Sequence, residues 1–537
     1  MTFLEKLRHY VDACYPALWV QTHEEGRICK DIFSAFAKKA TKDETGCKVY
    51  EWDSVVGLYE KLDEDKTKNI KDTDDPSKMF VAIKSLCSNE DSEAVFIIKD
   101  FHLQFEKPLK KIDYIRGFKN IINFLKAKRN MVIFVSPVVK VPVELQKEIQ
   151  LLDYALPDEE AIGRQLNFVI ESVNESKKGK DKLVVADEVR ERAVESAKGM
   201  TDSEVESAFS LAIVQNKQFD LKFVHSVFSE KIMQIKKGGL LNHLETDIDF
   251  SKVGGLAGIK DWIKTRKHAF SKKARNYGLP YPKGLGLAGI AGCGKTLISK
   301  AIANEFGFPL FQLDLGSLFS KYVGETEGNF IAMIKTVESI GRCVILIDEI
   351  EKYLNSGATS GHGDSGTSSR SFGTLLSWLS DRNSPAFIIF TSNNHLALPV
   401  ELVRKGRFDE LFWIDLPTED EVKEVYNVVI RKYGRDPKNF NIDSLQKKSM
   451  ELTGAEIDNL FKDALFAAYA DGEREVTNDD VINEIEVLTP QSKINEVAIT
   501  QMREKVIGRL RPAADYPALK EFAPNAGVGK AMRKVRA

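Results

Sequence analysis

Apolar positions along the chain fall into short β-branched runs that alternate with longer stretches of helical period. A continuous apolar run is typical of a strand buried on both faces, and its alternation with helices is typical of a parallel sheet. We therefore predict an α/β fold in each half of the chain. The candidate strands are 17–22, 48–52, 94–98 and 131–136 in the first half, and 286–289, 310–315, 344–347, 386–391 and 411–414 in the second.

The two halves resemble diverged copies of one module. Near residue 136 the chain reads MVIFVSP and then VPVELQKEIQLLDYALPDEEAI, and near residue 391 it reads FIIFTSN and then LPVELVRKGRFDELFWIDLPTEDEV. Both stretches run from a strand through Pro-Val-Glu-Leu, a helical turn, a short strand and Leu-Pro to an acidic helix start. Further on, GMTDSEVESAFSLAIV from Gly199 matches ELTGAEIDNLFKDALFAA from Glu451 in pattern. We predict a duplicated module; the alternative is that common elements follow this order by chance.

The sequence KKGGL at 236–240 has the composition of a hinge and marks the main predicted boundary. A length of 537 residues by itself suggests three or four units. We predict an N-terminal module at 1–235, with a sheet part at about 1–160 and a helical part at about 161–235, a linker at 236–246, a large α/β subdomain at 247–417, a helical lid at 418–490, and a C-terminal helix with a basic flexible tail at 491–537.

A phosphate-binding pattern, G-x-x-x-x-G-K-[ST], lies in the second half. It follows the strand pattern KGLGLAG and opens the apolar helix pattern LISKAIANEF, which is the context that the motif requires. Lys295 is expected to bridge the β- and γ-phosphate oxygens, and the Thr296 hydroxyl to bind Mg²⁺. The loop predicts ATP and Mg²⁺ as cofactors, against the alternative of a glycine-rich turn. The predicted nucleotide-binding residues here are Gly289, Ile290, Ala291, Gly292, Cys293, Gly294, Lys295, Thr296 and Leu297.

Polar side chains follow two further strands of the second half. Asp348 and Glu349 come directly after the apolar run 344–347, at the end of the strand where ligands bind in open α/β sheets. Asp348 is expected to reach Mg²⁺, and Glu349 to polarise the attacking water as a general base. Asn393 follows the strand at 387–391 and is expected to contact the γ-phosphate and orient the water. The alternatives are a capping acidic pair and a turn-forming Asn; the order of the three motifs favours catalysis.

The first half lacks this chemistry. After its first strand the chain reads HEEGRICKD, with no glycine loop and no Lys-Ser/Thr pair. Its acidic-strand equivalent ends VFIIKD, which puts Lys99 where the second half has Asp348. A cation cannot hold a magnesium ion. We therefore predict a degenerate module without nucleotide hydrolysis, with a structural or recruiting role.

Composition adds limits. A hydrophobic share of 43%, a charged share of 29% and a net charge of -2 are those of a globular protein without a strong overall field. The six cysteines have no metal-binding spacing, which predicts reduced thiols, although a thiol at Cys293 in the loop raises the prospect of sensitivity to alkylation. No signal peptide and no run of about eighteen apolar residues occurs, so we expect no membrane association and a cytoplasmic protein, or one in a plastid stroma or a phage-infected host cytoplasm.

With these motifs in this order, residues from about 247 to 490 resemble the classical clade of AAA+ ATPases. The layout with a degenerate N-terminal half is also similar to a poorly characterised AAA family encoded in some chloroplast genomes, cyanobacteria and phages. The resemblance implies a P-loop parallel sheet flanked by helices, a small helical lid and a preceding P-loop-less α/β module of similar architecture. The motifs that carry it are Val253-Gly254-Gly255-Leu256, the P-loop, SKYVGETE at 320–327, Asp348-Glu349, Ser392-Asn393 and LVRKGRFD at 402–409.

Several roles are implied by this resemblance alone. Gly254 matches a position near the adenine, and Gly454 and Ala455 match the lid residues near the ribose. Arg404 and Arg407 match paired arginine fingers, which act on the γ-phosphate of a neighbouring subunit and imply a homo-oligomeric, head-to-tail ring, usually of six subunits. Lys252 departs from the family, which more often has an acidic residue there. No arginine stands beside Gly454, which argues against a clamp-loading role.

The resemblance also implies two pore loops. Tyr322, Val323 and Gly324 match the aromatic loop that grips an extended polypeptide in the ring centre, and the alternative is a turn with a packed tyrosine. The polar, glycine-rich segment 356–371 matches the second pore loop. Together these motifs favour an ATPase in which Mg-ATP hydrolysis in a ring remodels an unknown protein client.

Two other functions remain open at this point. A nucleotide-gated assembly scaffold would recruit partners through the large degenerate half without threading them. A nucleic-acid-associated ATPase would use the C-terminal tail, where nine Lys/Arg against three Asp/Glu from Gln501 onward give a local charge of +6. Such tails are more often solvated termini. Nothing in the sequence identifies the client.

Overall fold

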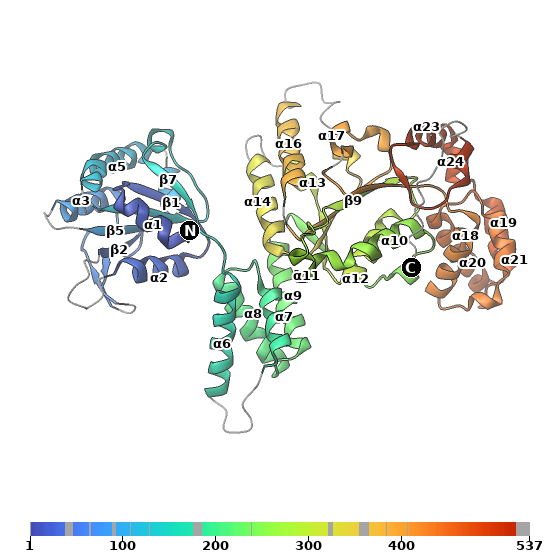
Figure 1. The fold of residues 1–537 in the computed structure, drawn as a ribbon, viewed down its shortest axis with the longest axis horizontal. Helices are drawn as coiled ribbons and strands as arrows, with labels where there is room; N and C mark the ends of the chain where they lie inside the picture. The colour runs from blue at the N-terminus through green and yellow to red at the C-terminus, as the bar shows by residue number, and fades with distance from the viewer. Residues whose placement is uncertain are drawn as a thin grey trace. The chain divides into compact units, whose positions relative to one another are not determined.

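The computed structural model describes residues 2–521 except 38–46, 64–65, 89–92, 108, 128, 176–184, 238, 320–325, 354–364, 383 and 405. The chain divides into two compact units, Met1–Phe228 and Ser229–Ala537. The division falls inside helix α9 (Leu221–Lys237), drawn in green in Figure 1. Within the described ranges, no helix combines the length and the apolar character needed to cross a bilayer.

The first unit contains a seven-stranded sheet in the order β4-β3-β2-β5-β6-β1-β7. The five strands β2, β5, β6, β1 and β7 are parallel, and β3 and β4 add an antiparallel edge. The strands are β1 (Ala17–Gln21), β2 (Lys48–Asp53), β3 (Gly57–Lys61), β4 (Thr67–Asn69), β5 (Ala94–Lys99), β6 (Met131–Ser136) and β7 (Ile149–Asp153).

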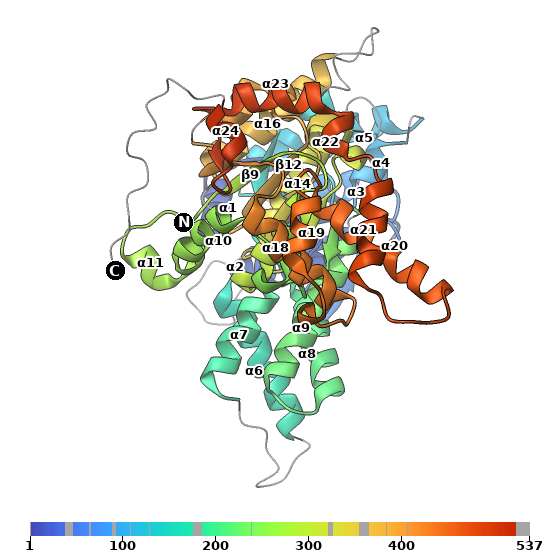
Figure 2. The ribbon, with the colours of Figure 1, turned by 90° about the vertical axis from the view of Figure 1, so that its right-hand side faces the viewer.

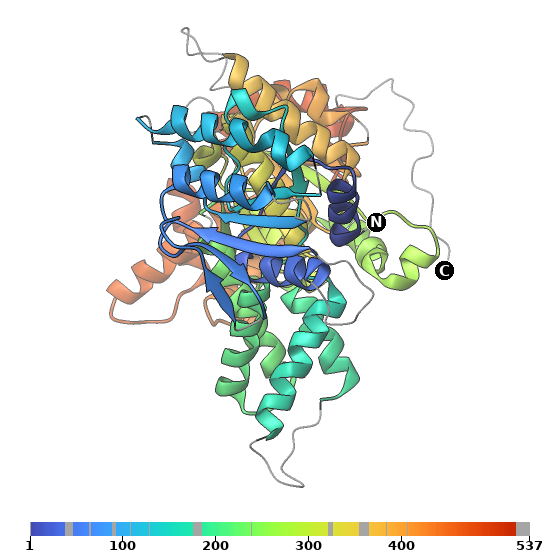
Figure 3. The ribbon, with the colours of Figure 1, turned by 90° about the vertical axis from the view of Figure 1, so that its left-hand side faces the viewer.

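Helices cover both faces of this sheet (Figure 3). One face packs an aromatic core, including Trp19, Phe96 and Phe134, against α3 and α5, and the other packs Val20 and Ile133 against α1 and α2. Burial on both faces explains why these strands are continuous apolar runs. The helices are α1 (Phe3–Asp12), α2 (Glu25–Phe36), α3 (Pro76–Cys87), α4 (His102–Phe105), α5 (Lys111–Lys126) and the short 3₁₀ turn η1 (Val143–Leu145).

A helical part completes the first unit and has its own apolar core, which includes Leu166, Phe209 and Phe223. Helix α8 begins with a capping box, because the Thr201 side chain accepts from the Glu204 N–H while the Glu204 carboxylate accepts from the Thr201 N–H. The helices are α6 (Glu159–Glu175), α7 (Asp187–Ala197), α8 (Asp202–Asn216) and the first half of α9.

The second unit contains another seven-stranded sheet, in the order β14-β13-β9-β12-β11-β10-β8. Its members are parallel except β8, which pairs antiparallel with β10 inside the segment predicted as a linker. Helices α10 and α12 pack on one face, and α14 and α16 on the other (Figure 1). The strands are β8 (Leu241–Leu244), β9 (Gly284–Gly289), β10 (Leu310–Leu313), β11 (Val344–Ile347), β12 (Phe387–Ser392), β13 (Glu410–Ile414) and β14 (Arg511–Pro512).

The other elements of this sheet layer are short turns and the covering helices. They are η3 (Phe250–Lys252), α10 (Ala257–Arg266), η4 (Lys267–Phe270), α11 (Lys272–Asn276), α12 (Lys295–Phe306), α13 (Leu315–Phe319), α14 (Thr326–Ile340), α16 (Ser365–Asp381), η5 (His395–Ala397) and α17 (Val400–Val403).

A four-helix lid follows the sheet, and Figure 2 views it directly. Its core includes Tyr426, Leu460 and Phe461. After the lid the chain continues through α22 (Gln491–Ile494) and α23 (Glu496–Val506) to β14 and α24 (Pro517–Glu521), so the C-terminal segment adds a strand beside β13. The lid helices are α18 (Glu419–Lys432), α19 (Ile442–Lys448), α20 (Gly454–Ala470) and α21 (Asn478–Val487), with the turn η6 (Pro437–Asn439).

The parallel strands of the two units follow the same topology. In chain order β1, β2, β5, β6 and β7 correspond to β9, β10, β11, β12 and β13, and in both sheets the first strand lies between the fifth and the fourth. This agreement supports the predicted duplication. The predicted α/β fold is confirmed, and each predicted strand is present with ends within two residues of those expected. The short edge strands β3, β4, β8 and β14 were not predicted, because they lack a continuous apolar run.

Candidate active site

The P-loop connects the buried strand β9 to α12 through residues 290–294. Gly294 precedes the helix with φ of 86°, a left-handed conformation that a glycine adopts without steric cost. The first turn of α12 carries no acidic side chain, so its N-terminal N–H groups and positive dipole end are available to an anion. The loop residues from Ala291 to Leu297 line a cleft of about 1060 Å³ together with residues of the lid.

Lys295 lies at the floor of this cleft and is only 7% exposed. Its Nζ donates to the carbonyl oxygens of Gly289 (2.9 Å) and Ile290 (2.8 Å), which holds the ammonium inside the curve of the loop. Burial lowers the pKa of Lys295, and the anionic groups around it, including Asp348 and Glu349, act in the opposite direction. The cation is therefore directed at the place where phosphate charge would compensate its desolvation.

Asp348 follows β11 and connects the P-loop helix to the neighbouring strand. Its Oδ1 accepts from the Thr296 hydroxyl at 3.4 Å and from the Thr391 hydroxyl of β12 in a short contact. Thr391 Oγ1 also accepts from the backbone N–H of Glu349 at 2.9 Å. The predicted metal-binding residues Thr296 and Asp348 thus lie beside each other. Thr391, which the sequence analysis did not identify, also contacts Asp348.

Glu349 and Asn393 meet across β11 and β12. Asn393 Nδ2 donates to Glu349 Oε1 at 2.9 Å, and Lys352 forms a short ion pair with Glu349 Oε2. The backbone of Glu349 has φ of 50°, which is uncommon for a residue with a side chain and directs its carboxylate into the cleft. Glu351 fixes the Asn393 backbone by accepting its N–H at 2.9 Å. The two side chains that the sequence assigned to water activation are therefore in direct contact.

The lid closes the opposite side of the cleft. Ala455, in the first turn of α20, donates its N–H to the carbonyl of Gly292 at 3.0 Å, and both Gly454 and Ala455 line the cleft. Gly254 also lines it and packs so closely on α18 that a Cβ would lie 2.7 Å from the backbone nitrogen of Val425. The structure therefore brings the predicted lid and adenine-edge positions to the same cleft as the P-loop.

Two lid carboxylates at this edge were missed by the sequence analysis. Glu421 Oε1 accepts from the N–H of Leu256, and Glu424 Oε2 accepts from the N–H of Gly255, both at 2.7 Å. These bonds fasten the glycine-rich edge of the cleft to α18. The only local signal is the capping box of Thr418 and Glu421 at the start of that helix.

The C-terminal segment also reaches the site, and nothing in the sequence pattern indicated this. Arg503 of α23 pairs with Asp415 through Nε and Nη2, the shortest contact being 2.6 Å, and the Asp415 side chain is only 2% exposed. Ala513 donates to the carbonyl of Trp413, and Tyr516 lines the cleft with 3% of its surface exposed. Residues beyond the lid therefore form part of the wall of the cleft.

The remaining predicted site residues lie away from this cleft or outside the described residues. Arg404 is exposed at the end of α17, and Arg407 donates to Ser380 Oγ at 3.3 Å and, in a short contact, to the Glu401 carbonyl. Neither arginine lines the cleft as far as the structure describes it. The predicted pore-loop residues Tyr322, Val323 and Gly324 lie outside the described residues, as do residues 356–364 of the second predicted pore loop. The rest of that predicted loop, 365–371, belongs to helix α16.

Cys293 lines the cleft but is also part of the apolar core beneath the P-loop. It is 8% exposed, and burial raises its pKa to about 12. Because the thiolate is the nucleophile in alkylation, a thiol held protonated at neutral pH reacts slowly. This environment argues against the alkylation sensitivity that its place in the loop suggested.

Three family models match separate segments of the chain. The family model described as "ATPase family associated with various cellular activities (AAA)" matches residues 285–416. The models "SpoVK-like AAA ATPase, N-terminal domain" and "SpoVK-like AAA ATPase, second domain" match residues 3–154 and 161–238. These ranges correspond to strands β9 to β13 of the second unit, to the sheet of the first unit and to helices α6 to α9.

Several curated proteins match this chain nearly end to end. The uncharacterized AAA domain-containing protein ycf46 of Trieres chinensis is 32% identical over 96% of this chain and 99% of its own length. The protein of the same name from Guillardia theta is 31% identical over 96% of this chain and 97% of its own length. Cell division control protein 48 homolog C of Arabidopsis thaliana is 30% identical over 44% of this chain and 29% of its own length. The chain therefore belongs to the AAA ATPase family, with full-length relatives among the ycf46 proteins, and it is an ATP hydrolase.

Proposed function

We propose that this protein is a ring-forming ATPase that couples Mg-ATP hydrolysis in its second unit to the remodelling of a protein partner. The observation that carries the proposal is the continuous set of contacts from Thr296 through Asp348 and Thr391 to Glu349 and Asn393, next to the buried Lys295. This set provides a cation, a metal-binding pair and a base with its orienting amide at one end of a parallel sheet. Partial matches to segments of the zinc metalloprotease FtsH and of a cell division control protein agree with such a role.

The donor set fits magnesium. Mg²⁺ holds oxygen ligands at about 2.1 Å in octahedral geometry, so neighbouring ligand oxygens lie about 3 Å apart. The hydroxyl of Thr296 and the carboxylate of Asp348 are separated by 3.4 Å, and phosphate and water oxygens would supply the other positions. When bound, the ion neutralises charge that develops on the phosphate oxygens.

The residues around Thr296 and Asp348 have separate roles in binding phosphate and activating water. Lys295 binds phosphate oxygens, and the α12 N-terminus stabilises their charge. Glu349 acts as the general base toward the attacking water, and Asn393 keeps the carboxylate in place through its amide N–H. The lid contacts at Gly292 and Gly255 keep bulk water from the adenine side of the cleft.

The arginines Arg404 and Arg407 are proposed to act on the site of a neighbouring subunit. Neither arginine lines its own cleft as far as the structure describes it, and Arg404 is exposed, which supports this role. A mixing experiment tests it, in which Arg404→Ala and Glu349→Gln subunits should each be inactive alone. Mixed rings should regain part of the ATPase activity, because Glu349→Gln subunits supply Arg404 to the intact Glu349 of their neighbours.

The matched control replaces the Glu349→Gln partner by the double variant Glu349→Gln with Arg404→Ala. This mixture has no arginine to supply, so its activity should remain at the background level. Restored activity with the double variant, or none with the single variants, would show that Arg404 does not act in trans.

The client is proposed to be a polypeptide gripped by Tyr322 in the ring centre. The Glu349→Gln protein, which should retain ATP, is the reagent for capturing that client. Tyr322→Ala is expected to keep ATP hydrolysis within about twofold while losing remodelling of the captured client. Unchanged remodelling by Tyr322→Ala would remove threading from the proposal and leave the assembly-scaffold function in its place.

A nucleic-acid role receives less support from the structure than from the sequence. Three of the nine basic residues of the C-terminal segment pair with carboxylates of the same unit, Arg503 with Asp415, Arg511 with Glu410 and Lys520 with Asp515. Residues 522–537 lie outside the described residues. Location in the cytoplasm or a plastid stroma stays part of the proposal, in keeping with ycf46 relatives.

A further inference from the structure

The first unit has a counterpart of the P-loop that is shorter and acidic. Strand β1 ends at Gln21 and α2 begins at Glu25, so three residues connect them where five connect β9 to α12. The last of the three is Glu24. Its side chain is only 3% exposed, although the connection Thr22-His23-Glu24 contains no aliphatic or aromatic hydrocarbon side chain to cover it. A buried carboxylate needs partners to offset its desolvation.

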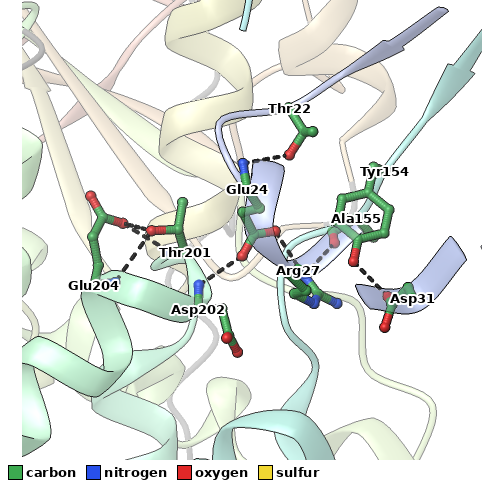
Figure 4. Close-up of polar contacts among 9 residues, drawn as sticks. All are labelled: Thr22, Glu24, Arg27, Asp31, Tyr154, Ala155, Thr201, Asp202 and Glu204. Atoms are coloured by element: carbon green, nitrogen blue, oxygen red, sulfur yellow. Dashed lines mark hydrogen bonds and ion pairs between the residues drawn. The ribbon is translucent and has the colours of Figure 1, made fainter. Parts of the chain in front are cut away.

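Glu24 finds those partners in two different parts of the unit (Figure 4). Its Oε1 accepts from the backbone N–H of Asp202 at 2.7 Å, and its Oε2 accepts from Arg27 Nη1 at 2.7 Å. Its own N–H donates to Thr22 Oγ1 at 2.9 Å, which fixes the connection. Burial raises the pKa of Glu24, while the Asp202 amide and Arg27 favour the ionised form and oppose that effect.

The helix that Glu24 binds is the counterpart of the lid helix at the nucleotide cleft. Helix α8 begins with a capping box of Thr201 and Glu204, and α20 begins with one of Thr453 and Glu456. In the second unit the first residues of α20 line the nucleotide cleft. In the first unit the corresponding helix N-terminus is already bound to a carboxylate, an anion of the kind that such a terminus favours.

Arg27 extends the same contact to the chain segment that enters the helical part. Its Nη1 also donates to the carbonyl of Ala155 at 3.0 Å, and its guanidinium lies 4.7 Å from the centre of the Tyr154 ring. Tyr154 in turn donates its hydroxyl to Asp31 of α2 at 2.6 Å (Figure 4). Sheet, connecting segment and helical part are therefore joined at one polar cluster.

The metal-binding position is replaced as well. Lys99 ends β5 where Asp348 follows β11, and its Nζ lies 3.1 Å from Glu25 Oε1 and 2.9 Å from Glu51 Oε2. The next residues, Asp100 and Glu349, share the same unusual φ of 50°. Burial by itself would lower the pKa of Lys99, yet the anionic groups around it outweigh this and raise it.

We infer that the first unit carries a built-in substitute for Mg-nucleotide, with the Glu24 carboxylate in the place of phosphate and the Lys99 ammonium in the place of the metal. Its helical part is therefore fastened to its sheet at all stages of the ATPase cycle. The first unit takes no nucleotide, and it acts as one rigid body while the second unit opens and closes around ATP.

Hydrogen–deuterium exchange on the full chain tests this inference. Glu24→Ala should accelerate exchange in the first turns of α8 and in 155–162 on the order of tenfold, because a charge-assisted hydrogen bond is lost there. Glu24→Gln, which preserves volume and an acceptor oxygen, should give a smaller increase and covers the case in which the alanine variant does not fold. Glu25→Ala is the matched control, because the Glu25 carboxylate pairs with Lys99 and, among the described residues, makes no hydrogen bond or ion pair with α8.

The second measurement compares hydrogen–deuterium exchange of the full-length Glu349→Gln protein with and without saturating Mg-ATP. Exchange should slow in α12 and in the first turns of α20, and it should not change in 22–36 or 201–209. Unchanged exchange in both Glu24 variants, or nucleotide-dependent protection of the first unit, would overturn the inference. Absence of protection in α12 and α20 would instead contradict the proposed nucleotide site and leave the effect of the Glu24 variants unaffected.

Discussion

The two units use the same parallel-strand order for opposite purposes. Around the second sheet, the polar groups at the strand ends converge on an open cleft and include partly exposed Glu349. At the corresponding strand ends of the first sheet, Glu24 accepts a hydrogen bond from Asp202 and Lys99 pairs with Glu51, both within their own unit. In the second unit a bound ligand would supply the charges that pair with the protein's polar groups. In the first unit the protein itself supplies both partners of each pair. The backbone that presents them is shared.

The largest difference should appear when Glu349 and its counterpart Asp100, near the ends of β11 and β5, are each neutralised. Glu349→Gln is expected to lower the ATPase rate by about 10²–10⁴-fold, because the general base is lost, while ATP binding is retained. Asp100→Asn, at the corresponding place in the first unit, should leave the rate within about twofold. Steady-state phosphate release and equilibrium nucleotide binding measure both. A normal rate in Glu349→Gln would remove it from the role of base.

A smaller difference in activity and stability is expected between Lys99 and Asp348, which lie one position before Asp100 and Glu349. Lys99→Met leaves the Glu51 carboxylate, 4% exposed, without its cation, and should lower the stability of the first unit by about 3 kcal/mol without slowing hydrolysis. Asp348→Asn should do the reverse and cost activity rather than stability. Denaturant unfolding monitored separately in each unit by hydrogen exchange distinguishes them. Lys99→Arg, which keeps the cation, controls for packing, and equal stability of Lys99→Met would contradict the ion-pair argument.

The smallest difference is expected at the buried thiols. Burial raises the pKa of both Cys29 and Cys293 to about 12, so both remain protonated at neutral pH and should react slowly with iodoacetamide. Cys14 is more exposed and should be labelled first, as mass spectrometry of the native chain would show. Cys293→Ala should change the ATPase rate by less than about twofold. Rapid labelling of Cys293 that abolishes hydrolysis would indicate a thiol accessible from the cleft.

Much of the second unit could be predicted because the residues of its candidate site occur in short contiguous segments of the sequence. Strand β9, the loop and α12 form one segment, and Asp348 and Glu349 follow directly on an apolar strand. The physical requirements of phosphate binding act on neighbours in sequence, so the pattern and the site coincide. The preceding α/β module followed from periodicity and internal similarity, and the helical lid was implied by the resemblance to AAA+ ATPases.

Edge strands and long-range polar contacts could not be predicted in the same way. Strand β14 is two residues long and contains Pro512, so neither length nor alternation marks it. The roles of Glu421 and Arg503 depend on which backbone or side chain lies opposite them in the folded chain. Solvated surface helices carry residues of the same types with the same spacing.

The sequence by itself determined that the chain has two related α/β modules and that one of them holds an ATP site. It did so because strand burial, glycine loops and strand-end carboxylates are local features. Only the tertiary structure decided how each site is completed. The Glu24–Asp202 bond joins residues 178 positions apart, the Leu256–Glu421 bond 165, and the Arg503–Asp415 pair 88. A buried charge is stabilised by whatever donor folding brings within reach, and that donor has no fixed place in the sequence.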